Sequence, residues 1–145
     1  MKPYDVTIVG AGPAGAVAAY LCAKSGLDTL IVEKKALPRM KSCGGGLTAR
    51  AMDLLTRIDC FDDKWIDGFY HQLQIHLPKI RRQYPVTDAE PFMGLVRRDQ
   101  FDLALTQKAV AAGATLHSEE SFRGFSPADK GRLEVTTDKA GLSTR

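Results

Sequence analysis

The chain has 145 residues, enough to bury the core of one domain, and its 44% hydrophobic and 26% charged content is typical of globular proteins. A formal net charge of +3, spread over scattered basic residues, gives no support for nucleic-acid binding. The three cysteines and three histidines show no metal-ligand spacing, and the sequence shows no leader or membrane-spanning stretch, so we expect no metal site and a cytoplasmic protein.

Residues 4–33 predict a strand–turn–helix–strand unit. The apolar run 4–10 is typical of a buried parallel strand, the Ala-rich segment 13–25 of a helix, and residues 28–33 of a second apolar strand. Pro13 suits the first helical turn, and Gly26 is placed for the left-handed residue that ends a helix.

Gly10, Gly12 and Gly15 lie between the first strand and the helix in the pattern GxGxxG. In a dinucleotide site these glycines permit the tight turn, the approach of a pyrophosphate and the packing of helix on strand. Glu33, at the end of the second strand, can accept hydrogen bonds from ribose hydroxyls and would repel a 2′-phosphate. The unit therefore predicts binding of NAD or FAD.

The next segment favours FAD over NAD. A further strand–helix unit is typical of an NAD dehydrogenase, but here a basic loop with Pro38 leads to Cys43 and three consecutive glycines. Without Cβ atoms, Gly44, Gly45 and Gly46 would let a flat ring lie against the backbone. Thr48 is expected to cap the helix that follows.

Further along the chain, residues 71–80 alternate apolar Leu73, Ile75 and Leu77 with polar residues, which predicts a half-exposed strand paired with residues 81–86 after a turn. Asp99 is expected to cap a third helix over residues 100–112 that ends at Gly113. Residues 114–118 and 132–137 predict two more strands, the first of them next to the initial sheet.

Three segments, YDVTIVGAGPAGAVAAY, EKKALPRMKSCGGGLTARAM and VRRDQFDLAL, resemble the geranylgeranyl reductase family of FAD-dependent oxidoreductases. The most specific element is PR-x-K-x-CGGG-L, and the resemblance runs to about Gly124. It implies an α/β, Rossmann-like FAD-binding domain over residues 1–145, of the glutathione-reductase type. It also implies an antiparallel β excursion at 65–96 that begins the substrate-side sheet.

Because members of that family are longer, the resemblance implies that residues 1–145 form the N-terminal portion of such a domain. A second chain that completes the fold is the alternative.

The resemblance also assigns roles to single residues. The glycine turn would hold the FAD pyrophosphate, Glu33 the adenosine ribose, and the backbone near Phe122 the adenine. Arg39 and Arg98 would flank the phosphates and ribose, because a guanidinium donates paired hydrogen bonds to a diphosphate. For Arg39, a solvated loop arginine is the alternative. The complete set of expected FAD-binding residues is Gly10, Gly12, Pro13, Ala14, Gly15, Glu33, Lys34, Arg39, Cys43, Gly44, Gly45, Arg98 and Phe122.

Cys43 is the candidate catalytic residue. Beside a flavin, its thiol could donate a proton to one alkene carbon while the reduced ring delivers hydride to the other. An isolated C=C bond needs such help, since no carbonyl stabilises a developing carbanion. The alternative is that Cys43 is a small residue fitting a crowded turn.

The expected function is FAD-dependent reduction of isoprenoid double bonds, with NAD(P)H as an electron donor and a small-molecule or prenyl-lipid substrate. Such a substrate would imply peripheral membrane contact. Two alternatives stay open: a flavin-dependent monooxygenase or halogenase relative, and a non-catalytic nucleotide-binding remnant. An NAD-dependent dehydrogenase is disfavoured by residues 38–46.

Overall fold

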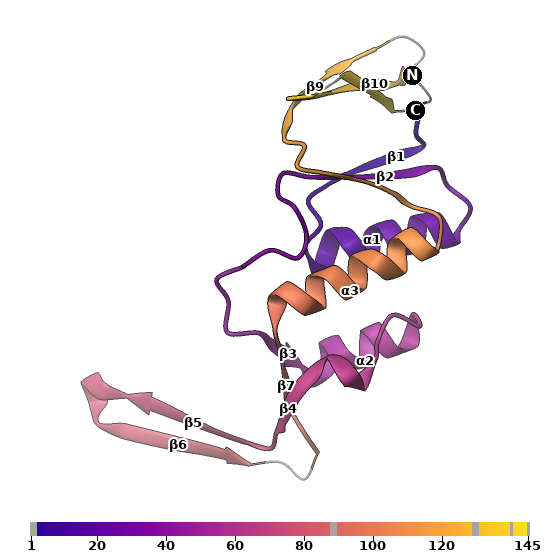
Figure 1. Ribbon diagram of the computed structural model, residues 1–145. Coiled ribbons are helices and arrows are strands. Elements are labelled where there is room, and N and C mark those ends of the chain that lie inside the picture. The colour runs from indigo at the N-terminus through magenta and orange to yellow at the C-terminus, as the bar shows by residue number, and fades with distance from the viewer. Residues whose placement is uncertain (1–2, 88–89, 129–130, 140, 145) are drawn as a thin grey trace. The chain divides into compact units, whose positions relative to one another are not determined.

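The computed structural model describes residues 3–87, 90–128, 131–139 and 141–144. The chain divides into two compact units, a first unit of Met1–Lys41 with Asp99–Arg145, and a second unit of Ser42–Arg98. Figure 1 shows their elements in chain order. Each unit is described below by itself.

A parallel sheet forms the centre of the first unit. Its strands are β1 (Val6–Val9), β2 (Thr29–Glu33) and β8 (Thr115–Ser118), in the order β1-β2-β8. All five residues of the central strand β2 are buried. Burial on both faces explains why this strand is a continuous apolar run in the sequence. The expected strand–helix–strand unit, and the expected pairing of the later strand with it, are confirmed.

Helix α1 (Pro13–Lys24) runs beside β1 and β2 (Figure 1) and buries Ala16, Ala19 and Ala23, whose small side chains allow close packing on the sheet. Gly26 has φ +82° just after the helix, as expected for the residue that ends it.

Helix α3 (Arg98–Ala111) buries Phe101, Leu105 and Ala109, which lie four residues apart on one face. It ends before Gly113, whose φ is +112°. The expectation that Asp99 caps this helix is wrong: the helix begins at Arg98, two residues before the expected start, so Asp99 lies inside its first turn. There the carboxylate still faces the positive end of the helix dipole.

An antiparallel sheet of β9 (Phe122–Pro127), β10 (Leu133–Thr137) and β11 (Gly141–Thr144), in the order β11-β10-β9, covers the other face of the parallel sheet (Figure 1). Val135 of β10 packs against Leu30 and Val32 of β2. The first unit therefore has three layers, with β2 in the middle. The strand expected at 132–137 is confirmed, whereas its two partners were not expected from the sequence.

The second unit is built from antiparallel strands. β3 (Gly46–Thr48), β7 (Met93–Val96) and β4 (Ile66–Tyr70) pair in the order β3-β7-β4, and β5 (Gln72–Leu77) pairs with β6 (Arg82–Thr87). Short 3-10 turns, Asp63–Trp65 and Pro78–Ile80, precede β4 and join the hairpin strands. Helix α2 (Ala49–Arg57) is capped as expected by Thr48, whose Oγ1 accepts from the Ala51 N–H at 3.3 Å.

The β5–β6 hairpin differs in one respect from its expected form. Its pairing and turn agree with the sequence pattern, but two apolar side chains of β5 stay partly exposed, Ile75 at 42% and Leu77 at 41%. Alternation predicts which side chains share a face and not whether another element lies on it.

Among the described residues, the structure contains no helix that combines the length and the apolar character needed to cross a membrane.

Candidate functional site

The glycine turn at the end of β1 is constrained by its own backbone. Gly10 has φ +98°, in the left-handed region, and its N–H donates to the Val32 carbonyl at 2.8 Å. A Cβ on Gly15 would overlap the carbonyl oxygen of Gly10, so only glycine lets α1 begin this close to the turn. The expected roles, a tight turn at Gly10 and close packing of the helix on the strand at Gly15, thus have a clear steric basis.

The start of α1 offers backbone donors. Gly12 is the N-cap residue, and within the part of the chain that the structure describes no side chain caps this end of the helix. Pro13 has no N–H, so the donors of the first turn belong to the residues after it. These donors and the helix dipole favour an anion at this position.

Glu33 is fixed in place by backbone groups from both sides. Its carboxylate is buried, with the residue only 4% exposed. Oε2 accepts from the Ala11 N–H of the glycine turn at 2.9 Å, and Oε1 accepts from the Lys35 N–H at 3.1 Å. Its carbonyl oxygen accepts from the Glu120 N–H at 3.0 Å. The acid at the end of β2 is therefore held against the turn that precedes α1.

Arg39 reaches the same corner from the loop after β2. Its Nε lies 3.4 Å from Glu33 Oε2, and its Nη1 lies 3.2 Å from Asp102 Oδ2. The Arg39 side chain is 12% exposed, so the alternative of a solvated loop arginine is wrong. Its role towards a diphosphate stays a prediction.

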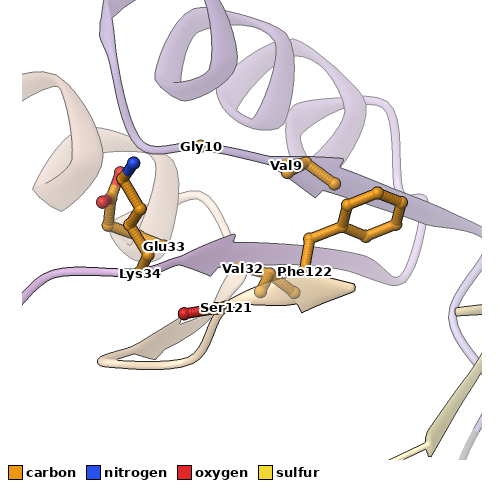
Figure 2. Close-up of a pocket in the computed structure, with 7 residues that line it drawn as sticks. All are labelled: Val9, Gly10, Val32, Glu33, Lys34, Ser121 and Phe122. Atoms are coloured by element: carbon orange, nitrogen blue, oxygen red, sulfur yellow. The ribbon is translucent and has the colours of Figure 1, made fainter. Parts of the chain in front are cut away.

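A hollow of about 260 Å³ opens beside Glu33. Val9 and the ring of Phe122 lie at one end of it, and the side chains of Glu33 and Lys34 at the other (Figure 2). Ser121 completes the wall from the strand side. One end therefore suits a flat apolar ring, and the other suits hydroxyl groups that donate to a carboxylate.

The predicted flavin-side residues belong to the second unit. Cys43 is exposed, and its Sγ accepts from the Gly45 N–H at 3.4 Å. Gly45 has φ +74°, and a Cβ there would overlap the carbonyl oxygen of Val96, so this position requires glycine. Gly44 is exposed, and Arg98 is the first residue of α3.

Sequence reasoning missed Asp102, which is fully buried and pairs with Arg39. The sequence feature that could have identified Asp102 is an acidic residue directly after Phe101, on the buried side of the expected helix. It also missed Ala11, whose contribution is a backbone N–H and leaves no trace in the side chain.

The three-layer unit, the glycine turn and the acid at the end of β2 define a dinucleotide-binding domain of the FAD type. Residues 3–144 match the family described as FAD binding domain, and the chain belongs to this family. The expected α/β, Rossmann-like FAD-binding fold is confirmed.

Among curated proteins, the chain is 38% identical over 112 residues to digeranylgeranylglycerophospholipid reductase 1 of Methanopyrus kandleri, a match that covers 77% of this chain and 28% of that protein. Among solved structures, it is similar to a geranylgeranyl bacteriochlorophyll reductase-like protein of Thermoplasma acidophilum, with a TM-score of 0.83 and 27% identity. That match covers 100% of this chain and 38% of the other.

The flavin-dependent halogenase CmlS is also similar, with a TM-score of 0.78, 25% identity, and coverage of 99% of this chain and 28% of that one. The chain thus spans less than a third of the length of the curated reductase it matches.

Proposed function

We propose that this chain supplies the adenosine-diphosphate half of the FAD site in an FAD-dependent oxidoreductase that reduces isoprenoid C=C bonds. The observation that carries the proposal is the buried carboxylate of Glu33, held by the Ala11 N–H at 2.9 Å next to the start of α1. A carboxylate so placed can accept from ribose hydroxyls while the helix start binds the phosphates.

Each part of the site fits one part of the nucleotide. Gly12, Ala14 and Gly15 would bind the diphosphate through the helix start, and Val9 and Phe122 would contact the adenine in the hollow of about 260 Å³. Lys34, which lines the same hollow, would add positive charge near the phosphates. The residues therefore fit adenosine diphosphate chemistry from one end of the site to the other.

Calorimetric titration of the purified protein with FAD, NAD⁺ and NADP⁺ tests the cofactor. We expect saturable binding of FAD, and no binding of NADP⁺, because Glu33 would repel its 2′-phosphate. Binding of NAD⁺ with no binding of FAD would contradict the proposal. FAD that is released from the purified protein on denaturation and identified by its visible spectrum would support it.

Reduced FAD supplies the hydride for the proposed reaction. The Cys43 thiol donates the proton: the S–H bond breaks, a C–H bond forms at the second alkene carbon, and the thiolate regains a proton from water. The hydride would bring two electrons to the C=C bond, which would become a C–C single bond while the reduced flavin is oxidised to FAD. The exposure of Cys43 and of Gly44 supports this role, because a substrate and a flat ring could both approach there.

Anaerobic incubation of dithionite-reduced, FAD-loaded protein with a prenyl lipid tests the reaction. We expect loss of double bonds by mass spectrometry, and a strong decrease for Cys43→Ala with FAD retained. Similarity to a halogenase favours a second candidate, in which reduced FAD reacts with oxygen. Oxygen consumption without alkene reduction would select that candidate.

The proposal includes NAD(P)H as electron donor, a cytoplasmic location and peripheral contact with a membrane. The phospholipid named for the Methanopyrus kandleri reductase supports the last of these. Bleaching of bound FAD by NADPH or NADH under anaerobic conditions tests the donor. Flotation with liposomes tests membrane contact, and a protein that stays in the bottom fraction would contradict it.

A further inference from the structure

Asp102 is a buried carboxylate that the proposed function does not use. It lies on α3 with 0% exposure, and its Oδ2 is 3.2 Å from Arg39 Nη1. A buried carboxylate is costly unless it is paired with a cation and hydrogen-bonded. Arg39 is such a cation, so the buried charge of Asp102 ties α3 to the loop after β2.

Asp102 shares the guanidinium of Arg39 with Glu33. The contacts of Arg39 with Glu33 Oε2, from Nε and from Nη2, are both long, at 3.4 Å. Arg39 also lies next to the glycine turn, since a Cβ on Gly12 would be 3.8 Å from its Nη2. One cation thus lies between two acids and beside the place proposed for the diphosphate.

The contact of Arg39 with both carboxylates determines how much of Glu33 stays free to accept further hydrogen bonds. If Asp102 did not hold Nη1, the fork of Arg39 could turn onto Glu33 and form a bidentate pair with it. That pair would occupy the carboxylate lone pairs that ribose hydroxyls need, because Ala11 and Lys35 already donate to the same group. It would also withdraw Nη2 from the glycine turn.

We propose that Asp102 is a positioning residue of the adenosine site: through Arg39 it keeps Glu33 able to accept from ribose and keeps the guanidinium beside the diphosphate. Asp102 itself does not touch the nucleotide. The inference rests on the proposed function, and Asp102 is not among the FAD-binding residues expected from the sequence.

Asp102→Asn is the first test, because it keeps the size of the side chain and removes its charge. We expect the affinity for FAD and for ADP-ribose to fall about tenfold, the size typical of a lost charge-assisted hydrogen bond. Thr106→Val is the matched control: the buried Thr106 Oγ1 donates to the backbone carbonyl of Asp102 at 2.8 Å, so its loss leaves the Asp102 carboxylate in place. We expect that variant to lose stability and to keep its affinity.

A double-mutant cycle with Arg39→Gln separates positioning from general destabilisation. If Asp102 acts through Arg39, the double variant binds ADP-ribose as weakly as Arg39→Gln alone. Unchanged affinity of Asp102→Asn, or losses that simply add, would overturn the role of Asp102 while wild-type binding upholds the proposed function. A wild-type protein that binds neither FAD nor ADP-ribose would overturn both. If Asp102→Asn does not fold, Asp102→Glu, which keeps the charge and shifts the carboxylate, takes its place in the same cycle.

Discussion

The central strand β2 of the first unit and strand β4 of the second unit differ in burial. In the first unit β2 is buried along its whole length, and its terminal acid is tied to backbone N–H groups on both sides. In the second unit large apolar side chains stay exposed, with Phe69 and Tyr70 of β4 each at 46%. The covered strand β2 thus fixes its terminal acid, whereas β4 presents apolar side chains at the surface. The two strands lie in different units of the chain, so the effect of a substitution in one unit can be compared with that of a substitution in the other.

The largest effects are expected from one glycine in each unit. A Cβ on Gly15 or on Gly45 would overlap a backbone carbonyl oxygen, and Gly45 has φ +74° besides. We expect Gly15→Ala and Gly45→Ala each to destabilise their own unit by roughly 3 kcal/mol, at the upper end for overpacking. Hydrogen exchange followed by mass spectrometry would show lost protection in the mutated unit.

Gly124→Ala is the control for these variants, because Gly124 lies on β9 in open space within the described structure. Loss of protection in both units after either single substitution would contradict the division of the chain and indicate one cooperative fold.

The next effect concerns the acid of the first unit. Glu33→Gln exchanges one acceptor oxygen for a donor group and removes the charge that faces Arg39. We expect FAD affinity to fall about 10- to 100-fold, since hydrogen bonds to charged groups contribute about 1.5–3 kcal/mol. Glu134→Gln, an exposed acid of β10, should bind FAD as the wild type does in the same titration. Equal affinity of both variants for FAD would contradict a role of Glu33 in the FAD site.

The two cysteines of the second unit give a smaller, kinetic contrast. Cys43 is exposed, whereas Cys60 is completely buried. We expect iodoacetamide to alkylate Cys43 several times faster than Cys60 in the folded protein, and at equal rates in denaturant. Peptide mass spectrometry measures both rates in one sample. Protection of Cys43 by added FAD would support its place beside the cofactor, and faster alkylation of Cys60 would contradict the described burial.

The smallest effect is expected at Asp138. The Ser121 N–H donates to its Oδ1 at 2.8 Å, and this backbone hydrogen bond is the main cause that lowers the Asp138 pKa from its ordinary value of 3.8. A lowered pKa in the folded state means that the stabilisation is complete above 3.8 and is lost as the pH falls through the folded-state value below it.

Asp138→Asn should therefore lower Tm slightly at neutral pH, and the difference from wild type should vanish at strongly acidic pH. Thermal unfolding at the two pH values, with Glu134→Gln as control, measures this. A difference that grows on acidification would contradict the expected sign.

The sequence predicted well those parts of the fold that local rules determine. Backbone sterics impose the glycine pattern, and burial on both faces imposes the apolar run of β2, so both were recognisable. The antiparallel partner β9 carries no comparable apolar pattern, because most of its side chains are exposed and need not be apolar.

The site was predictable to the extent that its groups are side chains in a known spacing, as for Glu33. The N–H of Ala11 was not predictable in this way, since every residue except proline supplies one. The partnership of Arg39 and Asp102 joins residues 63 positions apart, and only the tertiary structure reveals it.

The hydrogen bonds from Ala11 and Lys35 to Glu33 have a consequence for the speed of cofactor uptake. They hold the carboxylate in one orientation before any nucleotide arrives, so little side-chain entropy remains to be lost on association. If FAD binds as proposed, such preorganisation makes the adenosine end the first point of encounter, and diffusion and charge set the rate of capture instead of rearrangement of the protein.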